Sequence, residues 1–297
     1  MRFLIVRNKY NSKAFEASFT LEMYLTSQGI EYECFDSNEV PFFKPIVGLV
    51  GDMDQFDMVI VLGGDGSILR AAGQVGYRRI PILCTNYGHL GFMANSNAEG
   101  LIPLVAAALS GDAITEARTN LRVCVELQPT EFTRDPTEQA IAQKEAPVYE
   151  FFSLNEMALT RGERGRSIDF TYHVDGIKIA DMRGDGLVVS SATGSTGYAL
   201  SAGGPLVSPG YNGLVVVPIA PHTLHSRALV TAPSDVVEIV MRDSDDNRES
   251  SLFIDGEPVH FDSPIQRITV STGDEPTILL RYKSGSFYER ASEVFFS

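Results

Sequence analysis

The feature that most constrains the fold of this chain is an apolar run that leads straight into a glycine-rich loop and then into a helical pattern. Val59-Ile60-Val61-Leu62 is typical of a buried strand, Gly63-Gly64-Asp65-Gly66-Ser67 follows it, and a helix is expected from Ser67 to Val75. Glycines let the backbone approach a bulky anion closely and adopt torsions that other residues avoid. The N–H groups at the start of the helix would face the same spot. The pattern therefore predicts a phosphate-binding loop made by Gly63, Gly64, Gly66 and Ser67.

Asp65 is the unexpected residue of this loop. A carboxylate beside a bound phosphate is repelled unless a metal ion or a reacting proton lies between them. Asp65 is therefore predicted to act on a hydroxyl group or to hold a metal. The alternative is a plain turn, because Gly-Asp-Gly is common turn material. The apolar run argues against that alternative, since a simple connection after a buried strand needs few glycines.

The first third of the chain alternates strand and helix patterns. Strands are expected at Arg2–Arg7, Glu31–Phe35, Asp57–Leu62 and Ile80–Cys84, and helices at Ala14–Ser27 and Gly100–Leu109. Such alternation predicts parallel βαβ crossovers and a Rossmann-like, doubly wound α/β domain. Its ligand crevice should lie at the carboxyl ends of the strands, which is where the glycine loop falls.

The pattern of apolar and polar residues changes near Thr119. Apolar and polar residues alternate over 121–127 and 168–174, and short apolar runs recur as far as Ile278–Tyr282. Short strands with few helices between them predict an all-β, β-sandwich-like domain over residues 119–283. The polar segment Pro129–Pro147 is expected to be a long hairpin loop.

Composition argues against several classes of partner. The 297 residues carry a formal net charge of −14, which disfavours nucleic acid and anionic membranes, because both are bound through basic faces. No run approaches the roughly 20 apolar residues that span a bilayer. The polar start, Met1–Asn11, lacks a signal-peptide pattern. We therefore expect a cytoplasmic protein with no nucleic-acid and no membrane partner. A small phosphorylated ligand is compatible with this charge, because loop amides, local arginines and a divalent cation can neutralise phosphates.

The cysteines do not indicate a metal or disulfide framework. Cys34, Cys84 and Cys124 are odd in number and widely spaced. We expect them to be ordinary thiols packed as small apolar residues. No metal-ligand set is expected from the side chains of the protein.

A second cluster of glycine and hydroxyl residues lies in the β-rich half. Arg183-Gly184-Asp185-Gly186 precedes a strand, which runs into residues 190–198 and then Ser201-Ala202-Gly203-Gly204-Pro205. So many small and hydroxyl residues indicate close contact with a polar ligand, with the hydroxyls as donors and the glycines giving room. For Gly203-Gly204 alone, a glycine-rich bulge or a tight helix-to-strand packing contact is the preferred interpretation.

Asn155-Glu156 follows another apolar run. An adjacent amide and acid can recognise a base edge and a pair of ribose hydroxyls, although a dipeptide alone is more often a solvated strand end. The chain has no Gly-x-x-x-x-Gly-Lys-Ser/Thr motif and no full Gly-x-Gly-x-x-Gly after its first strand. A nucleotide site in this chain would therefore bind its phosphates through a loop other than these two motifs.

Taken together, and in this order, these segments resemble the NAD kinase family. The matching segments are Gly63–Gly66, Asn86–Phe92, Leu154–Glu156, Asp185–Gly186, Thr193–Pro205, Pro218–Leu224 and Asp255–Glu257. The first loop is shared with diacylglycerol, sphingosine and phosphofructokinase relatives, whereas the second glycine cluster with the Asn-Glu pair is highly specific.

The resemblance implies transfer of a phosphoryl group from ATP or polyphosphate to the adenosine 2′-hydroxyl of NAD, with Mg²⁺ or another divalent cation. It gives Asp65 the role of catalytic acid or base and places Gly66 beside it at the ligand. It also assigns dinucleotide contacts to Asn155, Glu156, Arg183, Asp185, Thr196, Gly197, Tyr198, Ala199, Leu200, Ser201 and Ala220. The family further implies that residues 284–297 return to the α/β domain of residues 1–118, and that the chain forms a homo-oligomer, a dimer or tetramer.

Three positions depart from the family pattern, and three other functions stay open at this point. Ala192 stands where the family usually has Pro, Gly197 where it has Ala, and Ser67 where Thr is commoner. A lipid kinase would need an apolar groove that the sequence does not offer. A phosphofructokinase-like sugar kinase would need a Thr-Ile-Asp-Asn-Asp run that is missing. A non-catalytic dinucleotide-binding regulator would keep the second cluster without needing Asp65.

Overall fold

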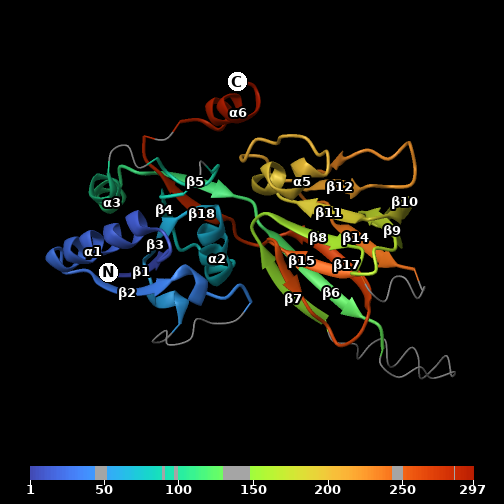
Figure 1. Ribbon diagram of the computed structural model, residues 1–297, viewed down its shortest axis with the longest axis horizontal. Helices are drawn as coiled ribbons and strands as arrows, with labels where there is room; N and C mark the ends of the chain where they lie inside the picture. Colours follow the sequence, from blue (N-terminus) through green and yellow to red (C-terminus); the bar gives the residue numbers. More distant parts are fainter. Residues whose placement is uncertain (44–51, 89–90, 97–99, 130–147, 243–249, 284) are drawn as a thin grey trace. The chain divides into compact units, whose positions relative to one another are not determined.

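The computed structural model describes residues 1–43, 52–88, 91–96, 100–129, 148–242, 250–283 and 285–297. Within these, the chain forms two compact units, Met1–Arg118 with Asp274–Ser297, and Thr119–Gly273 (Figure 1). Nearly all of the loop expected at Pro129–Pro147 lies outside the described residues.

The first unit is built on a six-stranded sheet of order β2-β1-β3-β4-β18-β5. Neighbouring strands from β2 to β18 pair in parallel, and β5 pairs antiparallel with β18. The strands are β1 (Arg2–Arg7), β2 (Glu31–Asp36), β3 (Met58–Gly63), β4 (Ile82–Asn86), β5 (Ile114–Arg118) and β18 (Thr277–Arg281). The helices are α1 (Ser12–Ser27), α2 (Asp65–Val75), α3 (Leu101–Ser110) and α6 (Phe287–Phe295), with short 3₁₀ turns at Ser37–Glu39 and Met53–Gln55.

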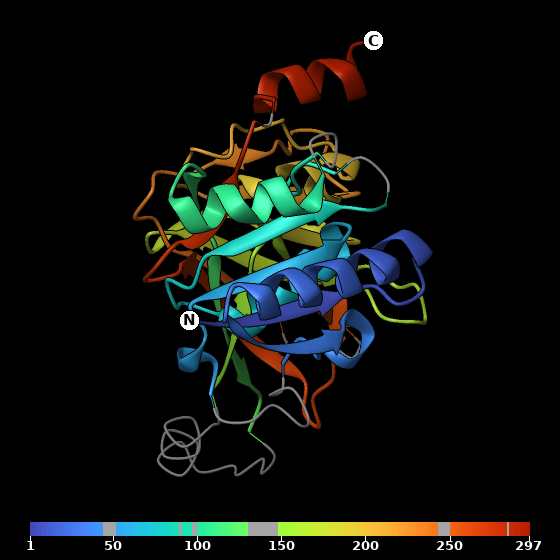
Figure 2. The same ribbon diagram turned by 90° about the vertical axis from the view of Figure 1, so that its left-hand side faces the viewer.

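Helices α1 and α3 cover one face of this sheet. Figure 2 shows them in front of the strands, and Leu21, Leu25 and Leu104 from these helices share one core with Ile5 and Ile60. Alternation along β3 turns Val59 and Val61, also fully buried, to the other face. Because β3 is covered on both sides, it is apolar throughout, as expected of a parallel strand. The predicted doubly wound α/β architecture is confirmed.

One strand belongs to a different sheet from the one expected. The apolar run Ile278–Tyr282, assigned from sequence to the β-rich half, forms β18 and pairs with β4 in the first unit. The chain therefore returns to the first unit at Asp274, earlier than the expected residue 284. Apolar periodicity identifies a buried strand but carries no information on which sheet it joins, and this is why the sequence reading erred.

The second unit contains two six-stranded antiparallel sheets, of orders β10-β9-β14-β17-β6-β7 and β13-β12-β11-β8-β15-β16. The strands are β6 (Leu121–Leu127), β7 (Val148–Ser153), β8 (Glu156–Thr160), β9 (Ile168–Val174), β10 (Ile177–Gly184), β11 (Gly186–Ser190), β12 (Val215–Ile219), β13 (Leu229–Val230), β14 (Val237–Met241), β15 (Ser251–Ile254), β16 (Glu257–Val259) and β17 (Ile265–Thr272). Side chains of both sheets, among them Val125, Phe170, Leu187 and Val216, form one core. The predicted β-sandwich is confirmed.

The outer face of the second sheet carries the site described below. Met157 and Leu159 of β8 point into the sandwich core, so Glu156, Ala158 and Thr160 point away from it. On that outer face Ala158 packs in a small apolar cluster with Ala199 of the short helix α5 (Tyr198–Ser201).

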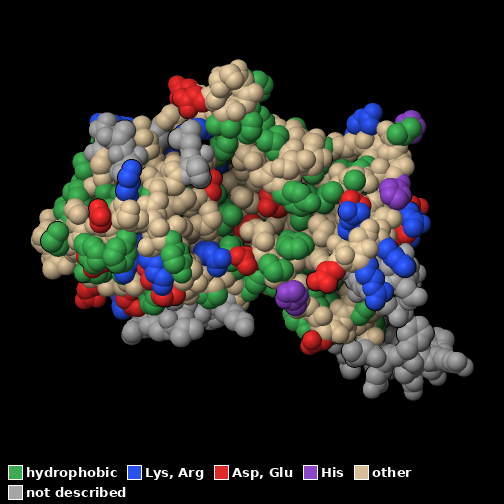
Figure 3. Space-filling view, viewed as in Figure 1, with side chains coloured by type: hydrophobic (Ala, Val, Ile, Leu, Met, Phe, Trp, Pro, Cys, Tyr) green, Lys and Arg blue, Asp and Glu red, His purple; other side chains and the backbone are tan. Residues whose placement is uncertain are grey.

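None of the helices that the structure describes combines the length and the apolar character that a membrane span requires. On the face of the first unit seen in Figure 3, Lys and Arg side chains are interspersed with Asp and Glu.

Candidate functional site

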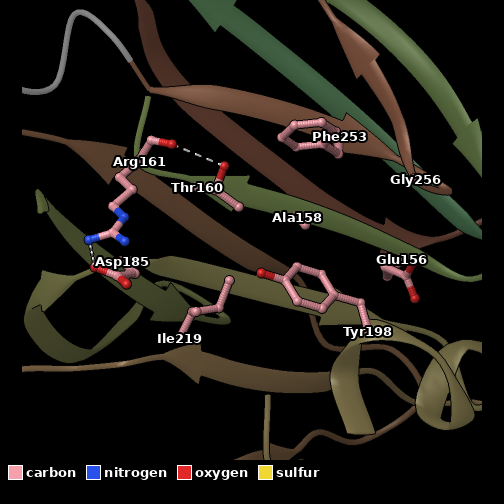
Figure 4. A pocket seen from close by; sticks show the side chains of 9 residues that line it. All are labelled: Glu156, Ala158, Thr160, Arg161, Asp185, Tyr198, Ile219, Phe253 and Gly256. Atoms are coloured by element: carbon pink, nitrogen blue, oxygen red, sulfur yellow. Dashed lines mark hydrogen bonds and ion pairs between the residues drawn. The ribbon is translucent and has the colours of Figure 1, made fainter. Parts of the chain in front are cut away.

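The second unit has a pocket of about 520 Å³ on the outer face of its second sheet. Its lining residues are Glu156, Ala158, Thr160, Arg161, Asp185, Tyr198, Ile219, Phe253 and Gly256. Figure 4 shows Phe253 and Tyr198 on either side of Ala158, with Arg161 and Asp185 at one end and Glu156 at the other. The pocket therefore has an apolar middle between two polar ends, which suits an elongated ligand with flat rings and polar groups.

The Glu156 end of the pocket is shaped by a tight hairpin between β15 and β16. Its two turn residues, Asp255 and Gly256, have φ values of 50° and 82°. A two-residue hairpin turn with both central φ values positive strongly favours the Asp-Gly pair found here. The turn places the Asp255 carboxylate in the buried interior of the unit.

Asp255 holds the Asn-Glu pair in position. Its Oδ1 accepts hydrogen bonds from the Ser153 hydroxyl at 2.6 Å and from the backbone N–H groups of Asn155 and Glu156 at 2.7 and 3.2 Å. Its Oδ2 accepts from the Leu154 N–H at 2.8 Å. A buried carboxylate with four donors fixes the backbone of residues 153–156. Sequence reasoning had not given Asp255 a role in the site.

The side chains of Asn155 and Glu156 each present an unpartnered acceptor. Asn155 Oδ1 and Glu156 Oε2 are buried and have no hydrogen-bond partner among the described residues. Burial, and then the nearby Asp255 charge, raise the pKa of Glu156 to about 8, while the Tyr198 N–H acts in the opposite direction. Buried polar atoms without partners are rare in proteins, so two adjacent ones indicate groups that a ligand would satisfy.

The hydroxyl groups of the second glycine cluster have other partners than predicted. From sequence, the serines and threonines of this segment were expected to donate to a ligand. Ser191 Oγ donates to the Leu154 carbonyl at 2.6 Å, Ser190 Oγ to the Ser191 carbonyl at 2.8 Å, and Thr196 Oγ1 to the Thr193 carbonyl at 3.2 Å. These hydroxyls are used within the protein. They tie the loop that follows β11 to the backbone of the Asn-Glu segment.

The glycines of this segment serve close packing. A Cβ at Gly194 would lie 2.3 Å from the Asn155 carbonyl oxygen, and one at Gly197 would lie 3.0 Å from Glu156 Oε2. Gly194 therefore lets the 3₁₀ turn Thr193–Thr196 approach the Asn-Glu backbone. At Gly197, where the resembling family usually has Ala, the missing methyl group leaves extra room beside the Glu156 carboxyl.

The other expected contact residues fall into two groups. Asp185 and Tyr198 line the pocket, whereas Thr196, Ala199, Leu200, Ser201 and Ala220 are not among its lining residues, and Ala199 is the buried residue of α5. The Arg183 side chain is exposed, and its guanidinium lies 3.9 Å from Asp169. The structure therefore does not bring Arg183 to this pocket.

Sequence reasoning missed several lining residues, of which Arg161 is the most informative. Its guanidinium lies 3.0 Å from the Asp185 carboxylate, and its backbone N–H donates to the Asp185 carbonyl at 2.8 Å. Figure 4 shows this ion pair at one end of the pocket. Ala158 and Thr160 could have been found, because they follow Glu156 at the two-residue spacing that places strand side chains on one face.

Asp65 lies in the first unit, on the first turn of α2. The helix begins at Asp65, two residues earlier than expected, with Gly64 as its N-cap at φ −101° and ψ −173°. Gly63, Gly64 and Gly66 all avoid positive φ, so the expectation of torsions closed to other residues was wrong. A Cβ at Gly63 would meet Ser67 Oγ at 2.6 Å, but one at Gly64 or Gly66 would meet nothing within 4 Å. These two glycines leave open space beside the helix N-terminus.

The Asp65 carboxylate is largely buried, and one of its two oxygens has a hydrogen-bond partner among the described residues. Its Oδ2 accepts from the Phe92 N–H at 3.2 Å, while its Oδ1 is buried with no partner in the described part of the chain. Burial raises the pKa of Asp65, opposed by backbone N–H groups and by the positive charges of Arg118 and Arg281. A carboxylate with a raised pKa and a free acceptor oxygen is suited to take a proton from a reacting hydroxyl.

The described residues contain no group of three or more His, Cys, Asp or Glu side chains able to hold a metal ion. Asp65 is one carboxylate with an unpartnered oxygen. Mg²⁺ commonly binds through one or two carboxylates together with substrate phosphates and water. The residues present fit a cation of that kind, brought with a phosphate ligand.

Comparisons with known proteins cover both units. Residues 5–113 match the model of the ATP-NAD kinase N-terminal domain, and residues 154–282 match that of the ATP-NAD kinase C-terminal domain. The NAD kinase of Francisella tularensis subsp. tularensis strain WY96-3418 is 33% identical over 297 aligned residues, covering 97% of this chain and 94% of that protein. The NAD kinase of Gemmatimonas aurantiaca is 35% identical over 234 residues, covering 79% and 75%.

Two solved structures share the fold. Yeast NADH kinase complexed with NADH has a TM-score of 0.81 at 20% identity and covers 100% of this chain and 87% of that one. An NAD kinase from Archaeoglobus fulgidus in complex with ATP has a TM-score of 0.69 at 24% identity, covering 100% and 98%. At these identities the structures bear on the fold, while the curated relatives settle the family. This chain belongs to the NAD kinase family.

Proposed function

We propose that this protein is an NAD kinase, which transfers the terminal phosphoryl group of ATP to the adenosine 2′-hydroxyl of NAD and so forms NADP. The observation that carries the proposal is the pair of buried, unpartnered acceptors, Asn155 Oδ1 and Glu156 Oε2, beside a pocket in the second unit. A dinucleotide offers the hydroxyl and amino donors that these acceptors need.

Different lining residues of the pocket are suited to different parts of NAD, the phosphoryl acceptor. Tyr198, Phe253 and Ala158 offer apolar surface against which a flat base can stack. Below pH 8 the Glu156 carboxyl is mainly protonated, so it can both donate to and accept from a ribose hydroxyl pair. Asp185, fixed by Arg161, is a carboxylate able to accept from an exocyclic amino group.

The chemistry is assigned to Asp65. Phosphoryl transfer asks a protein mainly to position the reactants and stabilise charge. We propose that Asp65 Oδ1 accepts the proton of the 2′-hydroxyl as the hydroxyl oxygen attacks the terminal phosphorus of ATP. The bond between that phosphorus and ADP breaks, and ADP departs from the opposite side. Gly63, Gly64, Gly66 and Ser67, with the N-terminal N–H groups of α2, are proposed to hold the donor phosphates.

A divalent cation, Mg²⁺ or another, is proposed to enter with the donor phosphates. It would offset their negative charge and would be held by Asp65 and the phosphates. We propose polyphosphate as a second donor, because the groups assigned to this end are ones that recognise phosphates.

We further propose that the protein acts in the cytoplasm, where NAD and ATP are available, and that it forms a homo-oligomer, a dimer or tetramer. The first proposal rests on the sequence composition described above, and the second rests on the family. Size-exclusion chromatography with light scattering tests the second, and a monomer at micromolar concentration would contradict it.

The direct test of the proposed activity uses the purified chain with NAD, Mg²⁺ and either ATP or polyphosphate. NADP is measured with an NADP-specific dehydrogenase, and NADH replaces NAD in a parallel arm. NADP formation is expected with at least one donor. If NAD binds but no donor yields NADP or NADPH, the protein is a dinucleotide-binding regulator.

A further inference from the structure

The first unit contains a cavity of about 240 Å³, separate from the pocket described above, and it has not yet been given a function. Three of its lining residues are arginines, Arg118 at the end of β5, Arg281 at the end of β18 and Arg290 on α6. Glu116 is the carboxylate among the lining residues. The cavity therefore gathers three positive charges and one negative charge, in a chain whose formal net charge is −14.

Two of these arginines lie beside one carboxylate, that of Glu116. Arg118 Nη2 lies 2.9 Å and Arg281 Nε 3.4 Å from the two oxygens of the same Glu116 carboxylate. Arg281 Nη1 also donates to the Met93 carbonyl at 2.6 Å. The Arg290 side chain makes no hydrogen bond or ion pair with any residue that the structure describes. Glu116 is thus the lining carboxylate beside two of the guanidinium groups, and Arg290 has no ion pair among the described residues.

Electrostatics make this arrangement unfavourable when nothing else is bound. Burial lowers the pKa of Arg281; Arg118 and Arg290 lower it further, and Glu116 acts in the opposite direction. The Arg281 side chain is 16% exposed and that of Arg118 only 4%, so water screens their repulsion weakly. A bound anion would relieve the repulsion and supply the missing acceptor.

The cavity lies next to the catalytic carboxylate within the same unit. Phe92 lines the cavity, and its backbone N–H donates to Asp65 Oδ2 at 3.2 Å. Arg118 and Arg281 also act on Asp65 through their charge. The α6 capping box already uses the N–H groups of Ser286 and Glu289, so the arginines are the groups that would recognise an anion.

We propose that this cavity binds a phosphate group through Arg281 and Arg290. Arginine matches phosphate geometry with two parallel N–H donors. The volume is below the roughly 300–1,000 Å³ of sites for drug-sized ligands, so the occupant is a phosphate or diphosphate and not a whole nucleotide. If it is part of the phosphoryl donor, the inference rests on the proposed function. If it is free inorganic phosphate, the cavity is a separate site.

Binding is tested directly with inorganic pyrophosphate as the probe, by calorimetry on the full-length protein at low salt. Arg290→Gln removes a guanidinium that has no partner within the described ranges, so folding should stay intact. We expect it to weaken pyrophosphate binding about tenfold, the size of one charge-assisted contact. Arg79→Gln is the matched control, since Arg79 is 68% exposed and lies outside the cavity. Equal pyrophosphate affinity in wild type, Arg290→Gln and Arg281→Gln would overturn the inference.

Steady-state kinetics distinguish the two sources of phosphate. If the donor occupies the cavity, Arg290→Gln raises the KM for ATP while the KM for NAD stays unchanged. If free phosphate occupies it, Arg290→Gln leaves the KM for ATP unchanged while still weakening pyrophosphate binding. Either result supports a phosphate site. A wild type that binds pyrophosphate in the cavity but makes no NADP would contradict the proposed function and leave this inference standing.

Discussion

Replacing Glu156 with Gln should make the protein more stable, by an amount that grows with pH. The Glu156 carboxyl is buried with an unpartnered Oε2, and its pKa is raised from 4.5 to about 8. The neighbouring Asp255 accepts from four hydrogen-bond donors, which favour its charged form, and this charge favours the protonated form of Glu156. Stability linked to this proton is fully present below pH 4.5 and is lost as the pH rises towards 8.

The magnitude follows from the two pKa values. Relative to a neutral amide of the same shape, Glu156 should cost roughly 1 kcal/mol at pH 5, roughly 3 kcal/mol at pH 7 and up to roughly 5 kcal/mol at pH 9. Glu156→Gln should therefore raise the urea midpoint slightly at pH 5 and strongly at pH 8, followed by circular dichroism. Glu163→Gln, at an exposed carboxylate, is the control and should change stability by less than about 0.5 kcal/mol at every pH. A stability difference for Glu156→Gln that does not vary with pH would refute this reasoning.

Two further substitutions test the loops. Asp255→Asn can keep the bonds to Oδ1 but leaves the buried Leu154 N–H facing an amide, so we expect a loss of roughly 1–3 kcal/mol in the free energy of unfolding and weaker NAD binding. Unchanged NAD affinity would show that Asp255 does not position the Asn-Glu pair. Gly66→Ala should stabilise α2 by roughly 0.5–1 kcal/mol, because a Cβ there meets nothing within 4 Å and Ala is the better helix former. The same variant should raise the KM for ATP, since the methyl group would occupy space proposed for phosphate. A more stable variant with an unchanged KM would remove Gly66 from the donor site.

Local patterns in the sequence predicted where strands and helices occur, but they did not predict which strands pair with one another. The run before Gly63 is buried throughout as β3, and the alternation over 121–127 is that of β6, with buried residues at every second position. Pairing across the chain is set by tertiary packing, so the apolar run of β18 gave no sign that it joins β4. Helix α2 began earlier than expected because Gly64, without a side-chain cap, can still serve as its N-cap.

The candidate site shows the same division. Glu156, Asp185 and Tyr198 could be proposed from residue type and motif, and all three line the pocket. The role of Asp255 depends on a hairpin turn that brings it to a loop about a hundred positions earlier in the chain, and sequence spacing does not reveal such a contact. The serine hydroxyls were misread because a hydroxyl-rich segment looks the same whether its donors serve a ligand or, as here, the backbone carbonyls of Leu154 and Ser191.

The most direct test of the central claim, that Asp65 is the proton acceptor, is the rate of NADP formation by Asp65→Asn at saturating NAD and MgATP. The amide keeps the bond from the Phe92 N–H and removes a buried charge, so the fold and NAD affinity should be retained. We expect the turnover number to fall roughly 10²- to 10⁴-fold, the typical contribution of a general base, or roughly 3–5 kcal/mol in the barrier. Near-normal turnover by a folded variant that binds NAD would contradict the account.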